Sequence, residues 1–234
     1  MTVTGPSTTI GATLPAMTLV APARDGSGPQ RLTGRQRREQ LLDVAAEVVL
    51  EGGADAATME GVAARAGVSK KLGYAHFANR DELLLALFDR EVSELDAAVA
   101  ASLAGARSLE EQIGSMVHAY LDVLDGRGLL LRGLLQSQLG RGPIADRQAD
   151  RQQRVWQFLA GLLVSGLGIP EVAATTAAAI LLDALDGAIA VWAAGVLSRP
   201  EVEAVFLDMA MGALRALTGP GAARSRRAPG RRAT

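Results

Sequence analysis

The sequence predicts an all-α protein of about nine helices arranged in two domains. Its 234 residues are 49% hydrophobic but only 3% aromatic. The apolar residues are mainly Ala, Leu and Val, a composition that favours helices over strands. Apolar residues recur three and four positions apart through most of the chain, and no segment alternates as a strand would. A chain of this length can hold a small N-terminal domain and a larger second one.

The composition excludes several classes of protein. Cysteine is absent, which removes disulfide frameworks, thiolate zinc sites and cysteine nucleophiles. Residues 1–33 have no signal-peptide pattern and predict a disordered tail, while residues 219–234 predict a basic tail that either contacts phosphates or only aids solubility. The most apolar stretch, 172–197, contains Asp183 and Asp186 near its middle. We therefore expect no membrane span and a cytoplasmic location.

The first four predicted helices are bounded by glycines and capping residues. The helix over 36–50 has one apolar face, made by Leu41, Leu42, Ala45, Val48 and Val49. The N-caps of the next three are Thr58 for 59–66, Ser69 for 69–75 and Asn79 for a long helix with apolar residues from Leu84 to Leu103. This long helix is expected to connect the two domains.

Five further helices are predicted after Gly105. The breaks between them are Gly126, Gly140 with Pro143, Gly166 with Gly168, and Ser198 with Pro200. The predicted helices lie near 108–125, 127–139, 144–166, 170–196 and 200–217.

Two short helices with a glycine between them predict a helix-turn-helix. Ala63 is small enough to let the helices approach, Gly67 can take the left-handed conformation of the turn, and Val68 fills the space between them. The net charge is only −1, so any nucleic-acid binding must come from a local patch. The only two lysines of the chain, Lys70 and Lys71, begin the second of these helices.

The segments Arg38–Ala46, Thr58–Phe77 and Ala78–Leu84 together resemble the N-terminal domain of TetR-family transcriptional regulators. The resemblance covers about Arg35 to Phe88 and implies a DNA-binding domain over 34–90, with its helix-turn-helix at about 58–77. The DNA contacts that it implies are Thr58, Ser69, Lys70, Lys71, Tyr74, His76 and Arg80. Arg35 and Arg38, from the cluster of arginines at the start of the first helix, are further candidates. One position departs from the family pattern, because Gly73 stands where a bulky aliphatic residue usually precedes the tyrosine. This departure predicts a less rigid recognition helix.

The resemblance also implies a ligand-binding and dimerisation domain over 91–218. Helices over 170–217 are rich in Ala and Gly and can pack closely, and the resemblance implies a homodimer through them that binds a pseudo-palindromic operator. The remaining helices are expected to enclose a small, largely apolar effector. Its candidate contacts, each with a purely structural role as the alternative, are His118, Tyr120, Gln136, Trp156, Asp183 and Trp192.

The resulting prediction is a ligand-responsive transcriptional repressor, with activation left open by the sequence. An enzyme is disfavoured, because neither His76 nor His118 has a metal-site partner at helical spacing and no nucleophile elbow is present. We accordingly expect no catalytic residues, no metal and no other cofactor. A helical protein-interaction module is the second alternative, although it would not explain why caps, a turn glycine and lysines coincide at one helix pair.

Overall fold

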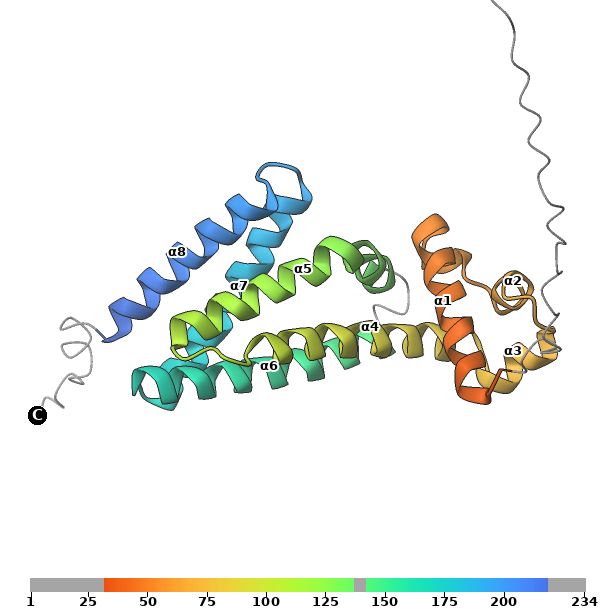
Figure 1. Cartoon of the computed structure of the whole chain (residues 1–234), viewed down its shortest axis with the longest axis horizontal. Helices are drawn as coiled ribbons and strands as arrows, with labels where there is room; N and C mark the ends of the chain where they lie inside the picture. Colours follow the sequence, from red (N-terminus) through yellow and green to blue (C-terminus); the bar gives the residue numbers. More distant parts are fainter. Residues whose placement is uncertain (1–31, 137–141, 219–234) are drawn as a thin grey trace, which may run out of the picture.

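The computed structural model describes residues 32–136 and 142–218, and this part of the chain is all-α, as predicted (Figure 1). It contains eight α-helices, one short 3₁₀-helix and no strand. The elements are α1 (Gly34–Gly52), η1 (Ala54–Ala56), α2 (Met59–Arg65), α3 (Lys70–His76), α4 (Arg80–Ser102), α5 (Leu109–Gln136), α6 (Pro143–Leu167), α7 (Glu171–Ala193) and α8 (Arg199–Thr218). Apart from Leu32 and Thr33, the two predicted tails lie outside the described residues.

The prediction of nine helices was wrong at Gly126. The segments 108–125 and 127–139 were expected to be separate, but they form the single helix α5 as far as the description extends. A glycine inside a helix costs only about 1 kcal/mol relative to alanine, so it does not end a helix that packs on both sides of it. Leu121 before Gly126 and Leu130 after it are both buried, which keeps α5 continuous.

The predicted N-caps are confirmed. Each cap side chain accepts a hydrogen bond from a backbone N–H of the first turn, which satisfies one of the free donors there. The bonds are Gly61 N to Thr58 Oγ1 at 3.1 Å, Leu72 N to Ser69 Oγ at 3.2 Å and Glu82 N to Asn79 Oδ1 at 2.8 Å. Sequence reasoning missed Thr33, which forms a capping box with Gln36 and starts α1 two residues earlier than expected.

Helices α1 to α3 form one group, and α4 leads from it into a second group that contains α5 to α8 (Figure 1). The two groups share a core, because buried residues near the end of α5 pack with those of α1 and α4. The contact is close: a Cβ atom added to Gly133 of α5 would lie 3.3 Å from Val49 Cγ1 of α1. Displacement of this end of α5 would therefore act directly on α1.

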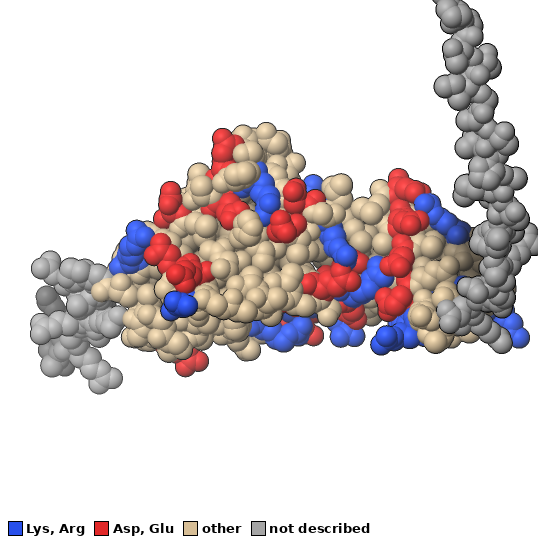
Figure 2. Space-filling model, in the orientation of Figure 1, with Lys and Arg blue, Asp and Glu red and all other residues tan. Residues whose placement is uncertain are grey.

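A buried carboxylate lies where the two groups meet. Glu91 of α4 is 2% exposed and accepts hydrogen bonds from Arg90 at 3.0 Å and from Arg127 of α5 at 2.9 Å. Arg90 also pairs with Asp43 of α1 at 2.7 Å and with Glu39 at 3.4 Å. Figure 2 shows basic side chains enclosed by acidic ones on the surface beside α1. Removing one partner of a buried charge is costly, so this network fixes α1, α4 and α5 relative to one another.

Helix α7 is long and apolar enough to cross a membrane, judged by length and composition alone. Its mean hydropathy reaches 1.6, yet only 22% of the corresponding 18-residue window is buried. The exposed large apolar side chains of α7 and α8 are Val172, Ile180, Val191, Val205 and Met209. Exposed apolar side chains on two neighbouring helices are typical of a surface that meets a protein, a ligand or a membrane.

Candidate nucleic-acid interface

The turn between α2 and α3 has the geometry of a helix-turn-helix. Gly67 has φ of 68°, a left-handed conformation that glycine adopts without a steric cost. The N–H of the next residue, Val68, donates to the carbonyl of Ala63 at 2.9 Å and closes the turn. Val68 packs against the core, as the sequence predicted. The turn therefore fixes the angle at which α3 leaves α2.

Gly73 lies where α3 crosses α2, and this position explains the departure from the family pattern. It is buried, and an added Cβ atom would lie 3.3 Å from Ala63 Cβ and 3.9 Å from Met59 Cε. The glycine thus allows a close approach of the two helices, which a bulky aliphatic residue would prevent. The lower rigidity of α3 stays a prediction.

We expect Gly73→Leu to lower the free energy of unfolding by about 1 to 3 kcal/mol, because the new side chain has no space beside Ala63. Urea unfolding followed by circular dichroism measures this change. Ala75→Leu is the matched control on the exposed side of the same helix and should change stability by less than about 0.5 kcal/mol. Equal effects of the two substitutions would show that the crossing at Gly73 is not tightly packed.

The exposed side of α3 carries Lys70, Lys71 and Tyr74. The Lys70 ammonium lies 2.5 Å from Glu60 Oε1 of α2 and 5.7 Å from the centroid of the Tyr74 ring. The Tyr74 hydroxyl donates to the same Glu60 oxygen at 3.3 Å. The hydrogen bond from Lys70 lowers the pKa of the Glu60 carboxyl, which stays ionised. Glu60 therefore orients both side chains, a role that its position in the first turn of α2 did not indicate.

Two further exposed basic side chains, Lys71 and Arg35, can contact a polyanion. Lys71 and Arg35 have no ion pair within the described part of the chain, and both are exposed. Thr58 and Ser69 are also exposed, and their hydroxyl groups cap α2 and α3. Thr58, Ser69 and Lys71 belong to the helix-turn-helix, and Arg35 lies in the first turn of α1.

The other predicted contacts hold the domain together. Arg38 Nη1 donates to the carbonyl of His76 at 2.8 Å, and its guanidinium lies 4.1 Å from the centroid of the Phe77 ring. The His76 side chain is half-buried in the last turn of α3. Arg80 donates to the carbonyl oxygens of Ala54 at 2.7 Å and Ala57 at 3.2 Å. These arginines thus anchor the end of α3 and the connection between α1 and α2.

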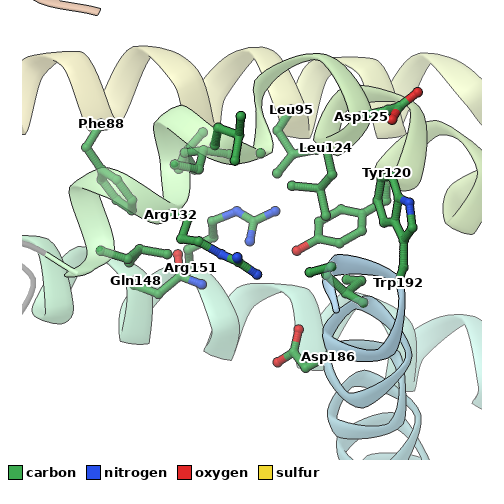
Figure 3. Close-up of a pocket in the computed structure, with 17 residues that line it drawn as sticks. Phe88, Leu95, Tyr120, Leu124, Asp125, Arg132, Gln148, Arg151, Asp186 and Trp192 are labelled. Atoms are coloured by element: carbon green, nitrogen blue, oxygen red, sulfur yellow. The ribbon is translucent and has the colours of Figure 1, made fainter. Parts of the chain in front are cut away.

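Two hollows lie among the helices of the second group. The first, of about 530 Å³, is formed by α4 to α7 and includes Phe88 and Leu131, two residues of the core shared with α1 (Figure 3). The second, of about 400 Å³, is formed by α4 to α8 and includes Phe206. Both volumes lie within the range of small-molecule sites, about 300 to 1,000 Å³.

The hollows include some of the predicted effector contacts and not others. Tyr120 lines both hollows and Trp192 lines the first. His118, Trp156 and Asp183 line neither, and the His118 ring instead meets Glu203 on the surface at 2.9 Å. Gln136 is the last described residue of α5, and its side chain lies outside the description.

The charged residue at the centre of the hollows was missed by sequence reasoning. Arg151 of α6 is 9% exposed and donates through Nε and Nη2 to Asp96 Oδ1 at 2.9 and 2.7 Å. Burial raises the pKa of the nearby Tyr120 hydroxyl, and the charge of Arg151 opposes this shift. A sequence signal existed, because Arg151 falls on the apolar face of α6, seven residues after Ile144 and eight before Leu159.

Residues 41–87 match the model of the tetR family of bacterial regulatory proteins, a stretch from α1 to α4 that includes the whole helix-turn-helix. Over these residues the chain is similar to the TetR family. TetR-family likeness is also found over longer stretches. The transcriptional activator FasR of Mycolicibacterium smegmatis is 36% identical over 104 residues, which are 44% of this chain and 48% of that protein. The transcriptional repressor KstR of Mycobacterium tuberculosis is 25% identical over 121 residues, 52% of this chain and 55% of that protein.

The chain thus matches about half the length of these curated TetR-family relatives. A TetR-like transcriptional regulator from Rhodococcus sp. RHA1 has a similar fold, with a TM-score of 0.64 and 24% identity over 81% of this chain and 100% of that chain. This likeness extends the TetR-type fold beyond α4. The match to the family model ends at residue 87, before Arg151, so it bears on the α2–α3 pair and not on the hollows.

Proposed function

We propose that the chain is a sequence-specific DNA-binding regulator of transcription, a homodimeric repressor that a small, largely apolar effector releases from a pseudo-palindromic operator. The observation that carries this proposal is the helix-turn-helix, whose α3 presents Lys70, Lys71 and Tyr74 on one exposed side. Helix α3 is the recognition helix, which lies in the major groove. The lysines neutralise phosphates or reach base edges, and the hydroxyls of Thr58, Ser69 and Tyr74 set the register on the backbone.

The basic residues divide into two groups by their contacts. Arg35, Lys70 and Lys71 are the DNA contacts that we retain in full, because they are exposed and Lys70 needs only to exchange Glu60 for a phosphate. Arg38 and Arg80 act by positioning α3 and the start of α2. Their phosphate contacts, and that of His76, are secondary.

Dimer formation rests on the exposed apolar surface of α7 and α8. Their exposed side chains, among them Ile180 and Met209, alternate along each helix with small residues such as Gly187 and Gly212, which permits close helix packing. Two symmetric copies would place two recognition helices on successive major grooves about 34 to 36 Å apart. We propose that a second copy, and not a bilayer, covers α7, since Asp183 lies near its middle. A cytoplasmic location is part of this proposal.

Release by an effector would act through the first hollow. Its wall includes Phe88 of α4 and Leu131 of α5, and both belong to the core that holds α1. An effector that prefers a different spacing of α4 and α5 would shift the population of two arrangements and change the distance between the recognition helices. An effector that bound tightly without altering operator affinity would contradict this mechanism.

FasR is an activator and KstR is a repressor. Experiment therefore decides whether this protein represses or activates transcription. The two alternative functions, a protein-interaction module and an enzyme, predict different results in the same DNA-binding experiment. A protein-interaction module would bind a partner and leave DNA free, and an enzyme would turn over a small molecule.

The test is selection of bound fragments from genomic DNA by the purified full-length protein, followed by affinity measurements across a salt series with nonspecific competitor. We expect one palindromic motif, and a logarithmic salt slope of about −0.9 for each phosphate contacted. A reporter gene under the selected promoter then separates repression from activation. Recovery of fragments without a common motif, or binding that competitor removes completely, would contradict sequence-specific regulation.

A further inference from the structure

The two hollows meet at a polar centre. Four residues line both of them, namely Tyr120, Gln148, Arg151 and Asp186. The rest of the second hollow is mainly apolar, with side chains from five helices that include Leu103, Ile113, Met116, Phe158, Leu182 and Phe206. A molecule that spans both hollows would therefore place a polar group at the centre and an apolar body in the second hollow.

Two guanidinium groups converge on this centre. Arg151 is held in place by Asp96 through Nε and Nη2, and its charge also acts on the Tyr120 hydroxyl. Arg132 of α5 lines the first hollow from its exposed rim and has no ion pair among the described residues. Figure 3 shows both side chains pointing into the same space, opposite the Tyr120 hydroxyl. Two forked donors aimed at one point form a binding site for a planar anion.

The carboxylates around the centre do not cancel both of these charges. Asp96 and Arg151 form an ion pair and offset each other, so Arg132 supplies the unpaired positive charge, and Asp125 is exposed at the edge of the first hollow. Burial and the neighbouring Asp183 raise the pKa of Asp186, so this carboxyl gives up its proton less readily than a free one. The exposed Arg154 adds a further positive charge to the second hollow. The balance favours a bound anion over a bound cation.

Resting on the proposed function of a ligand-responsive regulator, we propose that the hollows bind one amphipathic monocarboxylate, with its carboxylate between Arg132 and Arg151 and its hydrocarbon body in the second hollow. The same molecule would contact α4, α5 and α6 at once. It would thereby connect the charge at the centre with the helices that hold α1.

The test uses the full-length protein without DNA and simple probes, with binding measured by isothermal titration calorimetry. Decanoate should bind once per chain, and decan-1-ol and decylamine should bind at least about tenfold more weakly, since they lack the anion. Octanoate should also bind about tenfold more weakly than decanoate, because it buries two methylene groups fewer. Equal binding of the alcohol, or tighter binding of the amine, would overturn the proposal.

Substitutions test whether decanoate binds at the proposed site. Arg132→Gln should weaken decanoate binding about tenfold, whereas Arg107→Gln, an exposed arginine that lines neither hollow, should leave it unchanged. Asp186→Asn should strengthen binding, because it removes a nearby carboxylate. Unchanged binding in Arg132→Gln overturns the proposed site. A protein that binds its operator but not decanoate contradicts this inference alone, and one that binds decanoate but no DNA contradicts the proposed function alone.

Discussion

Replacing both Lys70 and Lys71 by alanine is expected to weaken operator binding at least about a hundredfold at physiological salt, because two charge contacts in the groove are lost and each is worth about 1.5 kcal/mol or more. The substitutions also release two fewer counterions, so the logarithmic salt slope should become shallower by about 2. Fluorescence anisotropy of a labelled operator across a salt series measures both quantities. Folding should be unaffected, since both side chains are exposed and Lys70 contributes only an exposed ion pair.

The matched control removes the same charge elsewhere. Arg107→Ala together with Arg147→Ala deletes two exposed arginines that lie outside α1 to α4 and outside the proposed dimer helices α7 and α8. This variant should keep its affinity within about threefold and its salt slope within about 0.5. A similar loss in both double variants would mean that only the overall charge attracts DNA. In that case α3 would not be a recognition helix.

Local signals in the sequence predicted the DNA-binding half of the molecule well. Caps at Thr58, Ser69 and Asn79 and the left-handed turn at Gly67 depend on neighbouring residues only, and all four are confirmed. Gly126 shows the limit of local reasoning. The same residue type that ends one helix is tolerated inside another when tertiary packing holds both sides.

The structure of α5 to α8 depends on contacts between distant residues, which one sequence does not show. Glu91 and Arg151 stand on apolar faces of their helices, so a rule that asks which charges interrupt such faces would have found both. The sequence does not identify the ion-pair partners of these two residues. Arg127 lies 36 residues after Glu91, and Asp96 lies 55 residues before Arg151, and only the folded chain brings each pair together.

The proposed dimer leads to the second large effect. We expect Ile180→Asp combined with Met209→Asp to convert the protein from a dimer to a monomer at micromolar concentration. Both side chains are exposed in the single chain, at 62% and 66%, so each protomer should remain folded. In the dimer the new carboxylates would be buried without a partner, which costs several kcal/mol for each symmetric pair. Analytical ultracentrifugation measures the change in association.

Loss of the dimer should also abolish tight operator binding, although no residue of α1 to α3 is altered. The second half of a dimer binds its half-site at a high effective concentration, and a monomer loses this advantage, which is typically a hundredfold or more. Leu129→Asp, on α5 and 76% exposed, is the control and should leave the oligomeric state unchanged. A wild-type protein that is monomeric in solution, or that partitions into lipid vesicles through α7, would contradict the dimer. The apolar surface of α7 and α8 would then be covered by something other than a second copy. A palindromic operator would no longer be expected, because that expectation depends on the two-fold symmetry of the dimer.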